Sequence, residues 1–211
     1  MIQTQTKTVT FDEFVAWYPE NSVNKYELHN GVIVEMPLGT GDHSDVTGFI
    51  RLKLSVEIDR RELPYSIPGD YLLKPVRNDA GYQPDVFVLD RAQLANEPRW
   101  KKESIITMGA SVRLAVEVVS TNWQDDYLVK VADYERLGIP EYWVVDYAAL
   151  GGRRFIGNPK QPTISVYQLV DGEYQISQFR GNDLVESLAF PELKLTASQI
   201  FRAGLPPTEP S

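Results

Sequence analysis

Two acidic residues stand in strongly apolar runs of this chain, and they are the first candidates for chemistry. Glu117 lies within the run RLAVEVVS, and Asp85 opens the run DVFVLD. A buried carboxylate is costly unless it is hydrogen-bonded, paired or bound to a metal. Two carboxylates on neighbouring strands would repel each other, and a divalent cation, Mg²⁺ or Mn²⁺ for oxygen ligands alone, relieves that repulsion. In the alternative interpretation, Asp85 caps a strand and Glu117 pairs with an arginine or lysine.

A helix predicted after Glu117 supplies a basic candidate. Asp126, Lys130 and Tyr134 are spaced four apart and therefore share one helix face. If this helix folds back over the end of the strand, Lys130 comes near Glu117. A lysine beside a metal-bound water and a phosphate could orient the nucleophile and offset the growing negative charge. The alternative is a solvent-exposed Asp126–Lys130 pair. Because alanine is the best helix former, Lys130→Ala is expected to leave folding largely intact.

Three further residues could take part in such a site. Glu27 lies in a short β-prone run, where it could complete a metal site or simply face solvent from an edge strand. His43 stands near the start of a predicted helix and could contact a scissile phosphate or a water, or could be an ordinary helix-end residue. His29 lies beside a hairpin turn and is interpreted as structural.

Periodicity and turn signals predict the elements that must position these side chains. Helices are predicted over about 11–18, 43–61 (with Asp42 as its cap) and 125–137. Strands are predicted over 26–28, 32–36, 71–76, 85–90, 113–120 and 141–147. The segment 91–107 is predicted to be irregular. A hairpin over 163–179, a short strand at 193–195 and a helix capped by Thr196 complete the chain. The order indicates an α/β (α+β) fold around a mixed β-sheet flanked by helices, with a C-terminal antiparallel β extension.

Length and composition limit the class of protein. The 211 residues predict a single domain over 1–205 and a disordered tail at 206–211. The chain has no cysteine, which excludes thiolate zinc sites, iron–sulfur clusters and a cysteine nucleophile. It has no apolar run long enough to span a membrane and no signal-peptide pattern, so a cytoplasmic protein is expected.

The charge balance argues against non-specific coating of DNA. Acidic residues exceed basic ones by 29 − 21, which gives a net charge of −8. If nucleic acid is the partner, local basic residues must offset this charge near the site. The candidates are Arg51, Lys53, Lys74, Lys101 and Lys102.

Together these segments resemble a known family. YELHNGVIVEM, His43, QPDVFVLD, LAVEVVS and DYLVKVADYERLGIPEYWVVD are similar, in order and spacing, to a bacterial restriction-endonuclease-like family of the PD-(D/E)XK nuclease superfamily. The resemblance covers about 11–147 and implies a restriction-endonuclease-like core there, with a β extension over about 153–203. It further implies Mg²⁺-dependent (or Mn²⁺-dependent) hydrolysis of phosphodiester bonds, with nucleic acid, and DNA above all, as the partner.

The resemblance also implies roles for individual residues. Asp85 corresponds to the PD aspartate and Glu117 to the second acid. The superfamily's lysine normally follows two residues after that acid, where this chain has Val119. Lys130 matches a lysine that has moved to the following helix. The remaining site positions are matched by Glu27, His43 and Tyr134. On this reading Asp85, Glu117 and Glu27 bind the metal.

Other functions remain open at this stage. A catalytically inactive nuclease-fold module for binding or assembly is favoured by the broken lysine motif and the acidic net charge. A glycosidase with two acids and no metal is a third reading, and it requires a wider separation of Asp85 and Glu117 across a sugar-sized cleft. A homodimer is also expected for a nuclease, since cutting both strands of a duplex needs two sites.

Overall fold

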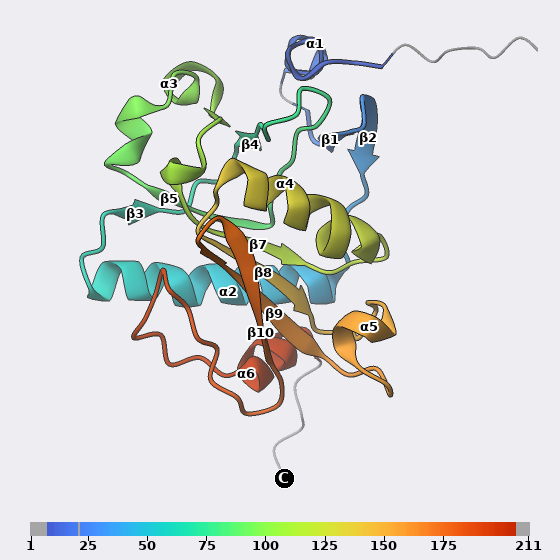
Figure 1. Ribbon diagram of the computed structural model, residues 1–211, viewed down its shortest axis with the longest axis vertical. Coiled ribbons are helices and arrows are strands. Elements are labelled where there is room, and N and C mark those ends of the chain that lie inside the picture. Colours follow the sequence, from blue (N-terminus) through green and yellow to red (C-terminus); the bar gives the residue numbers. More distant parts are fainter. Residues whose placement is uncertain (1–7, 21, 206–211) are drawn as a thin grey trace, which may run out of the picture.

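The computed structural model describes residues 8–20 and 22–205, and the predicted tail lies outside them. Its centre is a six-stranded sheet in the order β10-β9-β8-β7-β5-β3 (Figure 1). The strands are β3 (Tyr65–Ser66), β5 (Val86–Asp90), β7 (Val112–Val118), β8 (Glu141–Asp146), β9 (Thr163–Val170) and β10 (Glu173–Phe179). β7 and β8 run parallel, and the other neighbours pair antiparallel. The predicted mixed sheet and its antiparallel extension are thus confirmed.

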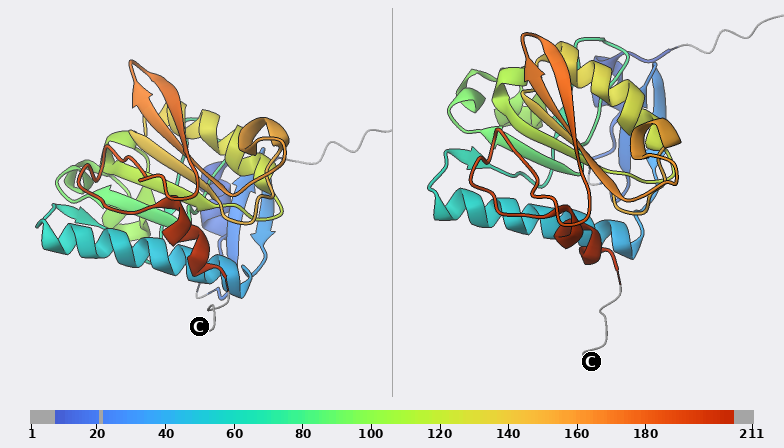
Figure 2. Two further views of the ribbon diagram at one scale, coloured as in Figure 1. Left: turned by 90° about the horizontal axis from the view of Figure 1, so that it is seen from below. Right: turned by 60° about the horizontal axis from the view of Figure 1, so that its bottom comes forward.

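Helices cover both faces of this sheet. Figure 2 shows α2 (Gly41–Arg60) and α6 (Ala197–Ala203) on one side. The other side carries α4 (Lys130–Leu137), which continues from one turn of π-helix, η3 (Asp125–Val129), and the short α5 (Arg153–Ile156). Side chains alternate along a strand, so Val86 and Val116 pack toward α2, whereas Phe87 and Ala115 pack toward α4. In the described part of the chain, no helix is both long and apolar enough to cross a bilayer.

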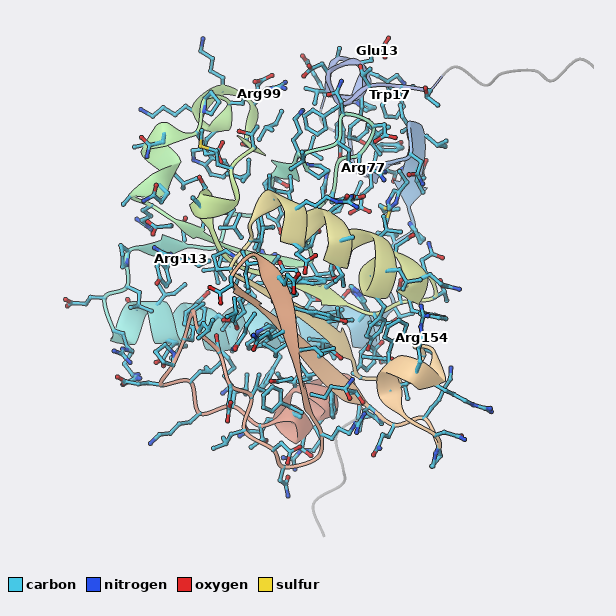
Figure 3. All side chains as sticks on the ribbon, viewed as in Figure 1. Glu13, Trp17, Arg77, Arg99, Arg113 and Arg154 are labelled. Atoms are coloured by element: carbon cyan, nitrogen blue, oxygen red, sulfur yellow. The ribbon has the colours of Figure 1, made fainter. Side chains whose placement is uncertain are left out.

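A smaller N-terminal unit packs beside the sheet. It contains α1 (Phe11–Trp17), the hairpin β1 (Lys25–His29) and β2 (Val32–Met36), and the short parallel pair β4 (Leu72–Leu73) and β6 (Ile105–Ile106). Leu28 exchanges two backbone hydrogen bonds with Gly81, each 2.9 Å long. Arg99, labelled in Figure 3, forms a 2.6 Å ion pair with Asp12 and so ties the segment before β6 to α1. These contacts fix β1 against the segment that leads into β5.

Both predicted hairpins are confirmed by their turns. Asn30 and Gly31 have φ angles of +51° and +74°, and Asp171 and Gly172 have +52° and +87°. Two consecutive residues with positive φ make the type of turn whose twist matches that of the paired strands. The register of β1 with β2 therefore follows from the sequence at the turn.

Several predicted elements are wrong in extent. The strand predicted over 71–76 contracts to β4, because Pro75 has no N–H to continue a ladder. No strand forms at 193–195, where one bridge between Leu184 and Thr196 replaces it. The segment 91–107 is not irregular: it holds a 3₁₀-helix (Gln93–Asn96), α3 (Trp100–Glu103) and β6. Thr40, not Asp42, caps α2, since its hydroxyl accepts a 3.2 Å hydrogen bond from the His43 N–H.

Candidate active site

Strand register places the two acids of the apolar runs side by side. β5 and β7 pair antiparallel, with Val86 opposite Val116. Asp85 directly precedes β5, and continuing the register by one residue would set it opposite Glu117. The Oδ2 atom of Asp85 accepts a 2.8 Å hydrogen bond from the Val118 N–H, which holds the carboxylate against the end of β7. The two acids therefore lie at the same end of β7.

Lys130 joins this pair from the helix side. Its Nζ atom lies 3.0 Å from Glu117 Oε1 and 3.4 Å from Glu27 Oε1. The Tyr134 hydroxyl donates a 2.9 Å hydrogen bond to the same Oε1 of Glu117. The structure thus brings Glu117, Lys130, Tyr134 and Glu27 together. The alternative of a solvent-exposed Asp126–Lys130 pair is wrong, because the two residues are only 7% and 4% exposed.

Glu27 is buried rather than exposed on an edge strand. Its Oε2 atom lies 2.8 Å from His29 Nε2, and its Oε1 atom accepts a 2.8 Å hydrogen bond from the Gln83 N–H. His29, interpreted from the sequence as structural, therefore touches a candidate site residue. The available signal was the spacing of two within a strand, which points Glu27 and His29 to the same side. The role of Gln83 had no such signal, because it depends on the pairing of Leu28 with Gly81.

Burial and charge set the protonation of the cluster. Burial disfavours a charged Lys130, but Glu117, Glu27 and Asp126 together raise its pKa well above the usual value. Burial also opposes ionisation of Glu27, yet the charge of Lys130 and the hydrogen bonds from His29 and Gln83 lower its pKa. For Glu117, burial outweighs Lys130 and raises the pKa well above the usual value. The ionised form of Glu117 would therefore be stabilised by additional positive charge.

The free oxygens of the acids fit a cation with few protein ligands. Within the described ranges, no three acid or histidine side chains are arranged to hold a metal ion. Both oxygens of Glu27 are already bonded, but Asp85 Oδ1 and Glu117 Oε2 have no hydrogen-bond partner among the described residues. Mg²⁺ keeps several waters and often takes only one or two carboxylates. Asp85 and Glu117 fit such an ion, and Glu27 fits a hydrogen-bonding partner of Lys130 better than a third ligand.

A second buried acid in the sheet shows what a structural carboxylate looks like. Glu141 Oε1 accepts a 2.6 Å hydrogen bond from the Trp143 indole. Its Oε2 accepts hydrogen bonds of 2.6 and 2.9 Å from the backbone N–H groups of Leu188 and Ala189. Both oxygens are satisfied, so Glu141 anchors a loop to the sheet. Glu117 differs from Glu141 because its Oε2 atom has no hydrogen-bond partner among the described residues.

His43 stands at the same edge, in the first turn of α2. Its Nε2 atom lies 3.0 Å from the carbonyl oxygen of Val118 and 3.4 Å from Asp85 Oδ2. The hydrogen bond to Asp85 raises the pKa of His43 above 6.5, although burial acts in the opposite direction. His43 thus contacts Asp85 directly, and no described contact joins it to Lys130.

This contact predicts a measurable titration in the metal-free protein. Asp85→Asn should lower the pKa of His43, because the variant removes the hydrogen bond and the charge that favour the imidazolium. Since the folded-state pKa is raised, His43 contributes stability below about pH 6.5 that is lost as the pH rises through the folded pKa. NMR titration of the histidine ring protons, assigned with His43→Gln, measures the shift. An unchanged His43 pKa in Asp85→Asn would contradict the assigned contact.

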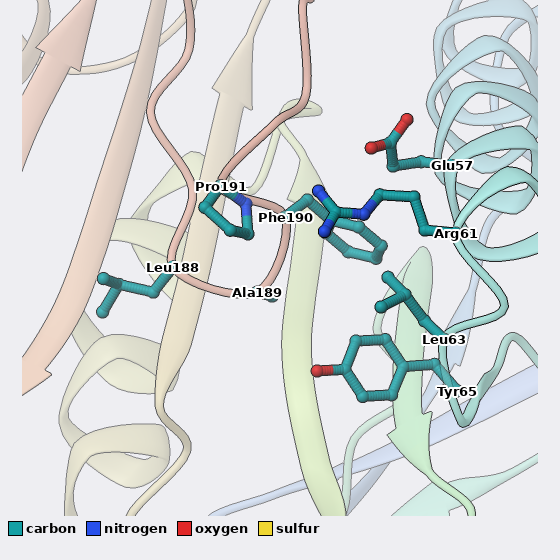
Figure 4. A pocket seen from close by; sticks show the side chains of 8 residues that line it. All are labelled: Glu57, Arg61, Leu63, Tyr65, Leu188, Ala189, Phe190 and Pro191. Atoms are coloured by element: carbon teal, nitrogen blue, oxygen red, sulfur yellow. The ribbon is translucent and has the colours of Figure 1, made fainter.

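A separate pocket of about 230 Å³ lies at the other end of α2 (Figure 4). Its lining residues are Glu57, Arg61, Leu63, Tyr65, Leu188, Ala189, Phe190 and Pro191. Fourteen residues of helix separate Glu57 from His43, a distance of about 21 Å along the axis. The pocket is therefore not part of the cluster around Glu117.

Comparisons with known proteins identify the family and the fold. The chain matches the Uma2 family, described as "Putative restriction endonuclease", over residues 11–198. A solved structure described as "a putative nuclease belonging to DUF820", from Anabaena variabilis ATCC 29413, is 19% identical with a TM-score of 0.71. That likeness, which shows a shared fold, covers 93% of this chain and 99% of the other. No curated protein matches. Because the family match spans most of its length, the chain belongs to the Uma2 family.

Proposed function

We propose that this protein is a metal-dependent endonuclease that hydrolyses phosphodiester bonds in nucleic acid. The observation that carries the proposal is the buried Lys130, 3.0 Å from Glu117, with Asp85 hydrogen-bonded to the N–H of the next residue, Val118. Family membership supports the same direction, since the family description names a nuclease class. In the superfamily the lysine normally lies on the same strand as the second acid, at the position of Val119 in this chain. Here Lys130 contacts that acid, Glu117, from a helix instead. Val119 therefore does not by itself exclude nuclease activity.

The residues of the cluster divide the work of the proposed reaction. Asp85 and Glu117 would hold Mg²⁺ or Mn²⁺, which when bound polarises the phosphate and lowers the pKa of a water. Lys130 remains charged and therefore cannot accept a proton; it orients the attacking water and stabilises negative charge growing on the phosphate. Tyr134 fixes the Glu117 carboxylate by its hydrogen bond. Glu27 holds the Lys130 ammonium in place.

Binding of nucleic acid requires positive charge near these acids. Arg51 Nη2 donates a 3.2 Å hydrogen bond to the backbone oxygen of Asp85, which sets this guanidinium beside the cluster. Lys53 and Lys74 instead lie over the rings of Phe49 and Phe11. Of the five basic candidates from the sequence, Arg51 is therefore the one whose described contacts reach a site residue.

Arg51→Gln should weaken nucleic-acid binding and make it less dependent on salt. Loss of one phosphate contact lowers the slope of log K against log salt by about 0.9 for a duplex. Fluorescence anisotropy with labelled single- and double-stranded DNA at several NaCl concentrations measures this slope. Lys101→Gln, on the exposed side of α3, is the matched control and should leave the slope unchanged. Equal slopes for the two variants would count against a role of Arg51 in binding.

A cleavage assay tests the function as a whole. Wild-type protein is incubated with DNA and RNA, single- and double-stranded, with Mg²⁺, Mn²⁺ or a chelator, beside Glu117→Gln. Metal-dependent cleavage that Glu117→Gln lacks supports the proposal, and the preferred substrate reports whether DNA is favoured. Binding without cleavage would instead support the inactive binding or assembly module, which the acidic net charge of −8 favours. Sedimentation analysis tests the homodimer that double-strand cleavage would require.

A further inference from the structure

Asp126 belongs to the cluster but has no part in the reaction described above. Its Oδ1 atom lies 3.7 Å from Lys130 Nζ, and the residue is 7% exposed. We propose that Asp126 is a positioning residue, which holds the Lys130 ammonium beside Glu117 and Glu27. This inference rests on the proposed function, because the position of Lys130 matters for cleavage only if Lys130 acts on the phosphate.

Three carboxylates surround the Lys130 ammonium, two of them at hydrogen-bond distance and Asp126 at ion-pair distance. An ammonium has three N–H donors and no acceptor. Three carboxylates from separate segments approach it: Glu27 from β1, Glu117 from β7 and Asp126 from η3, at 3.4, 3.0 and 3.7 Å. Without Asp126, two carboxylate partners remain, both on strands, together with the ring of Tyr82, whose centroid lies 5.6 Å from Nζ. Asp126 is therefore the partner that ties the ammonium to its own helical segment.

The backbone of Asp126 is fixed independently of Lys130. Its carbonyl oxygen accepts a 2.9 Å hydrogen bond from the hydroxyl of Tyr142, a fully buried side chain of β8. The turn that carries it is π-helical, and the N–H of Lys130 bonds to the carbonyl oxygen of Asp125, five residues back. Such wide turns occur mostly as single insertions within α-helices, often at functional sites. The backbone that carries the Asp126 carboxylate is therefore held against the sheet.

Other charged groups surround this carboxylate. Burial and the negative charges of Asp85, Glu27 and Asp125 raise the pKa of Asp126 to about 7, although Lys130 lowers it. Asp126 also interacts electrostatically with His43 of α2 and with Glu117, which forms an ion pair with the same lysine. The neighbouring Asp125 has the same charge and chemistry but forms no ion pair with Lys130 in the described part of the chain. Asp125→Asn is therefore a matched control for Asp126→Asn.

The contact is tested without metal or substrate. In ¹⁵N-lysine-labelled protein with a chelator present, the Lys130 ammonium should give a slowly exchanging ¹H–¹⁵N signal, assigned by its loss in Lys130→Arg. Asp126→Asn should speed its hydrogen exchange by about tenfold, the usual scale for losing one charged partner. Asp125→Asn should leave the rate unchanged. Equal exchange rates in the two variants would overturn the proposal. If Asp126→Asn does not fold, the smaller Asp126→Ser takes its place.

A cleavage assay then separates this proposal from the function it rests on. Asp126→Asn should lower the cleavage rate about tenfold, whereas Asp125→Asn should cleave like the wild type. Wild-type protein that cleaves nothing contradicts the proposed function, while the exchange measurement still reports whether Asp126 holds Lys130. Faster exchange in Asp126→Asn with full cleavage would show that Asp126 holds the lysine but does not position it for the reaction, which would also overturn the proposal.

Discussion

Lys130→Ala will lower the metal-dependent cleavage rate by about 10²–10³-fold, the usual cost of removing a group that stabilises transition-state charge. The same change will destabilise the fold at neutral pH, although alanine is the best helix former. Lys130 is 4% exposed and faces Glu117, Glu27 and Asp126. Removing one partner of a buried ion pair typically costs about 3–5 kcal/mol. The expectation from the sequence, that this variant would leave folding largely intact, is therefore corrected by the burial of Lys130.

The pH dependence of stability in Lys130→Ala shows whether unpaired carboxylates cause the loss of stability. Without Lys130 the buried carboxylates will have folded-state pKa values above their unfolded values. The stability of the variant should therefore be greatest below about pH 4, the ordinary range of these acids, and fall as the pH rises through the raised folded-state values. Urea unfolding from pH 4 to 8 measures this, with Lys130→Arg as the control that keeps a cation. Undiminished cleavage by folded Lys130→Ala would show that Lys130 has no role in the reaction.

Glu117→Gln should weaken metal binding and abolish cleavage without destabilising the protein. Burial raises the pKa of Glu117 well above its usual value, so the ionised form is unfavourable in the fold. An amide of the same shape can still accept the hydrogen bond from Tyr134, and Lys130 keeps Glu27 and Asp126 as partners. We expect metal affinity to fall at least about tenfold. Stability at pH 8 should equal or exceed that of the wild type.

Calorimetric titration with Mg²⁺ and Mn²⁺, paired with thermal unfolding, tests both parts of this prediction. Asp85→Asn serves as the comparison, because it removes the other carboxylate but also the charge that His43 faces. Glu141→Gln is a second control: it neutralises a buried acid whose two oxygens are both hydrogen-bonded, and it should leave metal affinity unchanged. Wild-type affinity in Glu117→Gln would mean that the ion binds elsewhere or not at all.

The parts of the fold that the sequence predicts well are those set by neighbouring residues. Asn30 and Gly31 determine the hairpin turn, and Thr196 caps the last helix through its hydroxyl. The meeting of Lys130 with Glu117 was also predictable, because a helix that follows a strand packs back against it. Asp126 shows where this reasoning stops. Spacing of four places it on the face of Lys130 but cannot tell whether that face meets the sheet or the solvent.

The remaining features depend on contacts between distant segments. The hydrogen bond from the Gln83 N–H to Glu27 exists because Leu28 pairs with Gly81 across more than fifty residues of chain. The segment 91–107 gained its short elements in the same way, since β6 pairs with β4 and Arg99 reaches Asp12. Local propensity carries little information about such pairings, which are set by the tertiary structure.

The placement of Lys130 and Glu117 on different elements also bears on how the molecule opens. When an acid and its lysine share a strand, they separate only if the sheet itself comes apart. Here the ion pair joins α4 to β7, so a local opening of α4 would break it while β7 stayed paired with β5 and β8. Detachment would carry the ammonium away from Glu27 and Glu117, so the repulsion between the acids would raise the free energy of the open form and favour reclosing. A bound divalent cation would reduce that repulsion, and would therefore lower the free energy of opening a helix that it does not touch.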